Sequence, residues 1–442
     1  MPRCGDRTAH HLSQVLETQP ELLPELLGLM AAAGQRVPEL LLPKLLRHGQ
    51  RNTAIRPALK AVLGERGRWL AAQNPDWRYG QGQGQAIADF ATETPELKAL
   101  WPGEDAQSRA INLRAWRQVD AQAAREALAA AWSSELAQER QALLGALATH
   151  LSLADEAFLE SALGDRGKAV RKVAADLLAQ LSGSGFGDRM ARRASAWVQM
   201  SQAGSGLAIA VTLPEAYDED WKRDGIELKA PRGEGQRAWW LRQILAYTPL
   251  AVWQAEPSAI VPALAGHEWQ DSLLLGWGLA AQRQGNAAWA EALLGQFGLR
   301  QFKDLQFVEL LALLSADTQE RFWRDFLISR MPKGKQPEEK ALAFGLEQLS
   351  QTELSLSIEF SRLLIQRLKL HCQSQQQHPY QWTYSARGLA RRLHPETAAE
   401  FAELLDTLPE GLKNPYGQNS LQTMLSCLRF RREMHQVFDA SG

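Results

Sequence analysis

The stretches RAINLRAW (109–116), RQALLGAL (140–147) and RKVAADLL (171–178) carry one helical pattern at equal intervals of 31 residues. In each stretch the residues two, four, six and seven positions after the first are apolar. Each begins with an arginine: Arg109, Arg140 and Arg171. A fixed period in this range is typical of helical hairpins that stack and bury a continuous core. The pattern therefore predicts an array of helical repeats.

The clearest helical pair is LESALGDRGKAVRKVAADLLAQL (159–181), in which GDRG (164–167) forms a tight turn between two helices. The turn aspartate Asp165 and the pair Val170-Arg171, which opens the second helix, give it a resemblance to a HEAT-type repeat. In such repeats the aspartate and the arginine bond between neighbouring hairpins. The resemblance implies that Asp165, Arg171 and the two earlier arginines are structural.

The rest of the chain divides into three expected segments. HEAT-like repeats should occupy residues 1–182, an irregular insert or linker residues 183–236, and further helical repeats residues 237–442. Within the insert, LAIAVTL (207–213) is a short apolar run with β-branched residues. This pattern indicates an extended segment or a small hairpin with 226–230. We therefore expect an all-α, HEAT-like α-solenoid with a small irregular, partly β insert near 205–235.

Composition narrows the class of protein. The 442 residues include 49 Lys+Arg and 50 Asp+Glu, a formal net charge of −1, which argues against a strongly basic nucleic-acid-binding protein. The three cysteines are far apart and lack zinc-site spacing, and no apolar run approaches the length of a membrane span. We expect a cytoplasmic protein with no metal, no cofactor and no catalytic motif.

Two groups of residues are candidates for binding a partner. A local basic strip combines lysines of the third repeat with arginines that follow it: Lys168, Lys172, Arg189, Arg192 and Arg193. The second group consists of aromatic residues outside clear helices and one neighbouring arginine. Its members are Trp77, Arg78 and Tyr79 in a glycine-rich loop, and Trp221 in the insert. Most of the 15 tryptophans lie on apolar helical faces, where packing between hairpins explains them.

The segments LGERGRWLAAQNPDW (63–77), LGDRGKAVRKVAADLL (163–178) and WKRDGIELKAPRGEGQRAWWLRQIL (221–245) resemble, in order, a bacterial family known only as a domain of unknown function. Its members are often encoded beside a MoxR-type AAA+ ATPase, a von Willebrand factor A-type protein and a SWIM zinc-finger protein. The resemblance implies a role in an ATPase-centred chaperone or assembly system. The repeat pattern without a catalytic motif predicts a non-enzymatic scaffold or adaptor that binds a protein partner, such as the ATPase or the von Willebrand-type protein.

Two alternatives remain. HEAT-like DNA glycosylases of the alkylation-repair type bind duplex through a concave basic face, so the basic strip could serve nucleic-acid binding or base repair. A hydrolase that uses the 205–235 insert is the third hypothesis.

Overall fold

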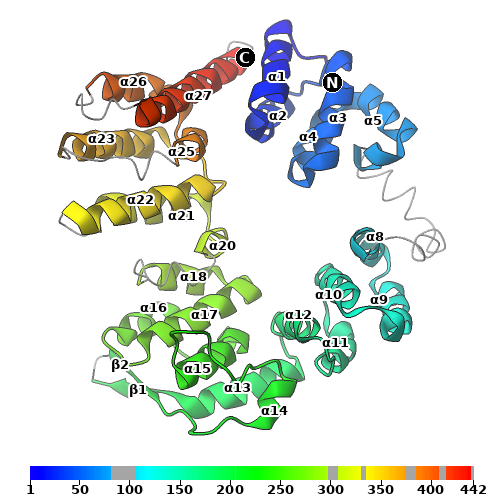
Figure 1. Cartoon of the computed structure of the whole chain (residues 1–442), viewed down its shortest axis with the longest axis vertical. Coiled ribbons are helices and arrows are strands. Elements are labelled where there is room, and N and C mark those ends of the chain that lie inside the picture. Colours follow the sequence, from blue (N-terminus) through cyan, green and yellow to red (C-terminus); the bar gives the residue numbers. More distant parts are fainter. Residues whose placement is uncertain are drawn as a thin grey trace. The chain divides into compact units, whose positions relative to one another are not determined.

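The computed structural model describes residues 1–80, 106–204, 206–296, 307–329, 335–374, 385–407 and 415–439 (Figure 1). In this part of the chain α-helices dominate, and the sheet structure is a single two-stranded hairpin. The expected all-α class is therefore confirmed. None of the helices in these ranges is long and apolar enough to cross a membrane.

The chain forms two compact units. Unit 1 combines 1–92 with 323–442, and unit 2 comprises 93–322. These limits differ from the three segments expected from the sequence. That division was drawn where helical patterns stop, whereas the units reflect which helices pack together. The three-segment division remains a prediction about the repeats.

Unit 1 contains two groups of helices, one from each end of the chain, and the longest helices, α22, α23 and α27, belong to the C-terminal group. The first group is α1 (Asp6–Thr18), α2 (Leu23–Ala32), α3 (Leu42–Arg51), α4 (Arg56–Val62) and α5 (Gly64–Gln73). The second is α22 (Lys335–Gln351), α23 (Ile358–Ser374), α25 (Ala386–Arg392), α26 (Ala398–Asp406) and α27 (Pro415–Asp439). A π-helical turn spans Asp325–Ser329.

Prolines lie at helix starts in unit 1. Pro24 and Pro43 lie in the first turns of α2 and α3, where the missing N–H is not needed. Helices α4 and α5 are separate, because Gly64 at the start of α5 has φ +64° and turns the chain between them. A Cβ there would lie 2.9 Å from Cδ of Arg36, so the turn requires glycine.

Both ends of the chain contribute to the core of unit 1. Leu12, Leu26 and Leu45 of the first helices are fully buried in one cluster with Met434 of α27. α27 packs directly against α1 and α2. Residues more than 400 positions apart in sequence thus share one hydrophobic core.

Unit 2 begins with short helices that pack in succession: α8 (Ala106–Val119), α9 (Ala121–Ala131), α10 (Ala137–Gly145), α11 (Glu156–Ala162) and α12 (Lys168–Leu178). α10 packs against both α8 and α12, and α11 packs against α12 (Figure 1). The second half contains α13 (Gly185–Trp197), α14 (Glu219–Arg223), α15 (Gln236–Tyr247), α16 (Pro257–Ile260), α17 (Gln270–Gln284), α18 (Ala287–Leu294) and α20 (Phe307–Leu311). α21 (Ala316–Arg324) crosses the boundary between the units.

Tryptophans fill the interiors of the helical layers, as expected. Trp116 and Trp277 are fully enclosed, and Trp277 lies between Trp253 and Trp289 with ring centroids 5.4 and 5.3 Å away. Trp69 of α5 differs, because 62% of it is exposed.

The insert is more regular than the sequence suggested. Residues 185–197, expected to be irregular, form α13, because Ser184 accepts a hydrogen bond from the Gly187 amide and caps the helix. The predicted extended segment is β2 (Gly206–Val211), but its partner is β1 (Val198–Ala203) and not 226–230. Gly204, with φ +62°, lies in the tight turn between the strands, so β2 pairs with the strand directly before it in the sequence.

Candidate functional site

A cavity of about 450 Å³ lies in unit 2 between α12, the segment 217–228 and the helices α15 and α17. α12 contributes Lys168, Arg171 and Lys172, which share one helical face because they are three and four positions apart. The α15 wall repeats this spacing with Trp239, Arg242, Gln243, Ala246 and Tyr247. The volume falls within the roughly 300–1,000 Å³ that ligand sites occupy.

Hydrogen bonds and ion pairs hold these walls together. Arg283 of α17 donates to Asp176 of α12 at 2.9 Å, which ties the two helices across the cavity. The amide of Gln243 accepts from the Glu227 backbone N–H at 2.7 Å and donates to the Glu227 carbonyl at 3.1 Å. These two hydrogen bonds fix the segment 217–228 to α15. The cavity is therefore built from fixed elements and does not depend on a ligand to form.

Aromatic rings line the cavity. The guanidinium of Arg242 lies 4.7 Å from the ring centroid of Trp239, and that of Arg283 lies 4.4 Å from the centroid of Tyr247. Burial raises the pKa of Tyr217 to about 12, and nearby carboxylates raise it in the same direction. Burial also raises the pKa of Tyr247. Both phenols stay neutral at physiological pH, so the aromatic wall carries no negative charge.

The charge of the lining is strongly basic. Six of the lining residues are Lys or Arg, and only Glu219 and Glu227 are acidic. Three cations have partners: Lys168 pairs with Glu227 at 3.0 Å, Arg242 with Glu234 at 2.7 Å, and Arg283 with Asp176. The other three make no ion pair with any residue in the described ranges: Arg171, Lys172 and Lys222. The cavity can therefore accept anionic groups next to an aromatic surface.

Comparison with known proteins places the chain in a family. Residues 1–438 match the model of a family described as Family of unknown function (DUF5691). The chain belongs to this family. No curated protein and no solved structure shows significant similarity to this DUF5691 chain. The resemblance seen in the sequence is thereby confirmed, while the neighbouring ATPase, von Willebrand-type and zinc-finger genes remain an expectation.

Two of the three periodic arginines of the DUF5691 chain form a ladder of ion pairs with later carboxylates, and Arg171 does not. Arg109 donates two hydrogen bonds to Glu135, one of 2.9 Å, and Nε of Arg140 lies 2.7 Å from the Asp165 carboxylate. Arg171 does not bond to the Asp165 side chain: its Nη1 donates to the carbonyls of Asp165 and Arg166 at 2.7 and 3.1 Å. The bond from Asp165 to an arginine of a neighbouring hairpin is therefore made with Arg140 and not with Arg171.

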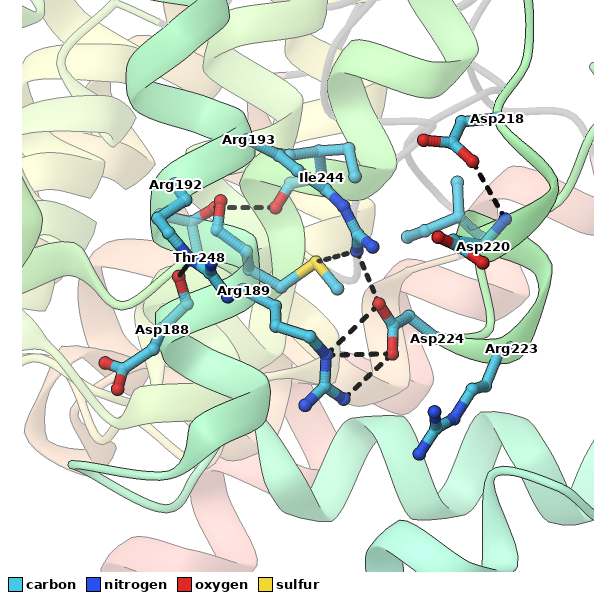
Figure 2. A network of polar contacts seen from close by, with 12 residues as sticks. Asp188, Arg189, Arg192, Arg193, Asp218, Asp220, Arg223, Asp224, Ile244 and Thr248 are labelled. Atoms are coloured by element: carbon cyan, nitrogen blue, oxygen red, sulfur yellow. Dashed lines mark hydrogen bonds and ion pairs between the residues drawn. The ribbon is translucent and has the colours of Figure 1, made fainter.

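The expected basic strip is interrupted by a buried acid. Asp224 lies between two arginines of α13 (Figure 2): Nη2 of Arg189 is 2.8 Å and Nη1 of Arg193 2.5 Å from its carboxylate. Nη2 of Arg189 also lies 2.9 Å from Glu160. Burial would lower the pKa of Arg189, but its bonds to these carboxylates outweigh burial and raise it. Arg189 therefore joins α13 to α11 and to the residue that follows α14, Arg193 joins α13 to that same residue, and neither is free for a ligand.

The other residues of the candidate set are dispersed. Lys168 and Lys172 line the cavity, whereas Arg192 is exposed on α13 and donates to the Asp188 carbonyl at 3.4 Å. Trp221 is buried and packs edge-on against Trp197 with ring centroids 5.2 Å apart. Trp221 is thus part of the core beneath the insert.

The segment around Trp77 is not an open loop. Residues Pro75–Gly80 form a 3₁₀-helix, and Trp77 is half-buried against the core of unit 1. The Tyr79 hydroxyl donates to the Leu46 carbonyl, and the Arg56 guanidinium lies 4.3 Å from the Tyr79 ring centroid. Burial raises the pKa of Tyr79 to about 12. The side chain of Arg78 lies outside the described residues.

Sequence reasoning missed most of the cavity. Trp239, Arg242, Gln243, Ala246 and Tyr247 line the cavity from one face of α15, and their successive spacings of three, one, three and one residues were the available signal. No local sequence pattern indicated that α17 and the segment 217–228 would complete the cavity. Among the described residues, no three His, Cys, Asp or Glu side chains are placed to hold a metal ion.

Proposed function

We propose that this DUF5691 chain is a non-enzymatic adaptor with a HEAT-like repeat scaffold, and that it binds a protein partner through the cavity between α12 and α15. One observation carries the proposal: a preformed, aromatic-lined cavity in which Arg171, Lys172 and Lys222 have no acidic partner among the described residues. Unneutralised cations beside aromatic side chains are typical of sites that bind acidic or amphipathic segments. The arginine ladder supports the repeat scaffold.

A protein partner fits better than duplex nucleic acid. Nucleic-acid binding draws on many cations spread along one face. Here Asp224 and Glu160 together neutralise Arg189 and Arg193, two of the five residues of the basic strip. The remaining cations are concentrated in a cavity, which suits a short anionic segment better than a phosphate backbone.

The family resemblance supplies candidate partners. Members encoded beside a MoxR-type AAA+ ATPase and a von Willebrand factor A-type protein would act with them in an assembly or chaperone system. We therefore expect one of these two proteins to present an acidic segment to the cavity.

The test is direct binding between purified components. The immobilised chain is presented with the MoxR-type ATPase and the von Willebrand-type protein of the same genome. Reversal of two exposed cavity charges, Lys172→Glu with Lys222→Glu, should weaken binding at least tenfold. Arg192→Glu, an exposed charge reversal outside the cavity lining, should leave it unchanged.

Two outcomes would contradict the proposal. If neither protein binds the intact chain, the expected partners are wrong. If the cavity variant and the control variant bind equally well, the cavity is not the binding site. A parallel titration with duplex DNA addresses the alternative. Tight binding that falls steeply with salt and is lost in the cavity variant would replace the adaptor with a nucleic-acid-binding protein.

A further inference from the structure

The arginine ladder stops at Arg171. The first two arginines each meet a carboxylate 25 or 26 positions later: Arg109 meets Glu135, and Arg140 meets Asp165. The equivalent positions after Arg171 are Ala196 and Trp197, and neither can supply a carboxylate. No ion pair to Arg171 occurs within the described residues. Arg171 instead lines the cavity.

Arg171 is nevertheless held as Arg140 is held. In Arg140, Nη1 donates to the Glu135 carbonyl at 2.6 Å. The other edge of its guanidinium, Nε and Nη2, meets the Asp165 carboxylate at 2.7 and 3.0 Å. In Arg171, Nη1 likewise donates to backbone carbonyls five and six residues earlier. The backbone therefore fixes one edge of each guanidinium, and only in Arg140 is the other edge occupied by an internal acid.

From this difference we infer that Arg171 is an anion-recognition residue, whose Nε and Nη2 edge takes an Asp or Glu side chain of a bound peptide. An external carboxylate would complete the third step of the ladder in the geometry that Asp165 provides in the second. Paired N–H donors match the two oxygens of a carboxylate, which favours arginine over lysine at this position.

The surroundings of Arg171 define the rest of the peptide. Lys172 is exposed one residue along α12, and Lys222 lines the same cavity, so a second acidic residue would find a cation there. Trp239 and Tyr247 form the opposite wall and can bury an apolar or aromatic side chain. The cavity therefore fits an acidic segment that contains one large apolar residue. This inference rests on the proposed adaptor function and specifies its ligand.

The experiment measures fluorescence anisotropy of a labelled 12-residue peptide, with Glu and Asp around one central Trp, added to the full chain. A second peptide carries Gln and Asn in place of the acids, and a third carries Gly in place of Trp. The acidic Trp peptide should bind at least tenfold more tightly than either.

Variants of the chain locate the contact. Arg171→Ala should weaken binding of the acidic peptide at least tenfold, and Arg171→Lys should weaken it about fivefold, because lysine keeps the charge but loses the paired donors. Arg166→Ala removes an exposed arginine of the same turn and should stay within twofold. Thermal unfolding of each variant shows whether the fold is intact. If Arg171→Ala does not fold, the Arg171→Lys result decides.

Failures of the two proposals can be told apart. Equal binding by Arg171→Lys, Arg171→Ala and the intact chain overturns the role of Arg171. Absence of peptide binding, while the ATPase or the von Willebrand-type protein still binds through the cavity, overturns the peptide inference and leaves the adaptor in place. If neither the peptide nor either protein binds, both the peptide inference and the adaptor proposal are overturned.

Discussion

Arg140 and Asp165 form a side-on ion pair that joins α10 to the turn before α12. Nε and Nη2 of the arginine lie 2.7 and 3.0 Å from the two carboxylate oxygens, and each side chain is 6% exposed. Asp165 also accepts a hydrogen bond of 2.7 Å from the Gly167 amide. Loss of either partner would leave a buried charge without compensation, so the pair is a strong determinant of how these helices stack.

We predict that Asp165→Ala lowers the free energy of unfolding of unit 2 by about 3 kcal/mol, because Arg140 would remain buried and unpaired. The matched control is Glu291→Ala. It breaks the Arg321–Glu291 pair, whose side chains are 68% and 54% exposed, and should cost at most about 1 kcal/mol. Urea unfolding, with hydrogen exchange to assign the transition to unit 2, measures both. Equal losses would show that burial does not control the strength of these pairs.

A second buried pair predicts sensitivity to acid. The Asp155 carboxylate accepts hydrogen bonds from Arg117 at 2.8 and 3.0 Å, and both side chains are fully buried. Burial raises the pKa of Asp155, but bonds from Arg117, Arg125 and the Ser152 amide outweigh burial and hold it below 3.8. A depressed carboxylate pKa stabilises the fold above the unfolded-state value, and this contribution disappears as pH falls through the folded-state value.

The corresponding variant is Asp155→Asn. At pH 7 it should destabilise unit 2 by about 3–5 kcal/mol, because Arg117 loses its counter-charge. The difference from the wild-type chain should begin to shrink as pH falls below about 4, because the Asp155 carboxylate of the unfolded chain then takes up a proton while that of the folded protein stays ionised to lower pH. Urea midpoints between pH 7 and pH 3 measure the difference. A gap that stays constant over this range would contradict an ionised Asp155 in the folded protein.

The sequence predicted those features that local pattern determines. The helix over 171–178 and the packing of most tryptophans follow from the spacing of apolar residues, and both are present. The partner of Arg140 was missed because the acid lies 25 positions away, in the next turn. Asp224 was missed for the same reason, since it neutralises arginines 31 and 35 positions earlier. Long-range partners depend on which helices stack, and residue spacing carries little of that information.

Trp77 illustrates this limit and gives a third prediction. Its glycine-rich surroundings suggested an exposed loop, but the ring is half-buried against the core of unit 1. Trp77→Ala should therefore cost about 2 kcal/mol, somewhat less than the 3–5 kcal/mol of a fully buried aromatic residue. Trp69→Ala removes the same side chain from a site that is 62% exposed and should change stability by less than about 0.5 kcal/mol. Thermal unfolding compares the two, and equal shifts would contradict the packing of Trp77.

The ends of the chain provide the last prediction. Arg431 of α27 is 3% exposed and donates to both oxygens of Glu25 in α2 at 2.7 and 2.8 Å, and His435 lies 2.8 Å from the same carboxylate. Burial raises the pKa of Glu25, but hydrogen bonds from His435 and Arg431 outweigh burial and lower it below 4.5. The carboxylate is therefore ionised at neutral pH and anchors the last helix to the second.

Glu25→Gln should destabilise the contact between α27 and the first helices by about 3 kcal/mol, since the buried guanidinium loses its counter-charge. Amide hydrogen exchange should accelerate across α1, α2 and α27 and stay unchanged in α17 of unit 2. Glu433→Gln makes the same charge change on an exposed residue of α27 and serves as the control. If exchange in α27 accelerates while α1 and α2 keep their protection, the last helix does not support the N-terminal helices. The shared core would then depend on Leu12, Leu26 and Leu45 packing with one another, without Met434.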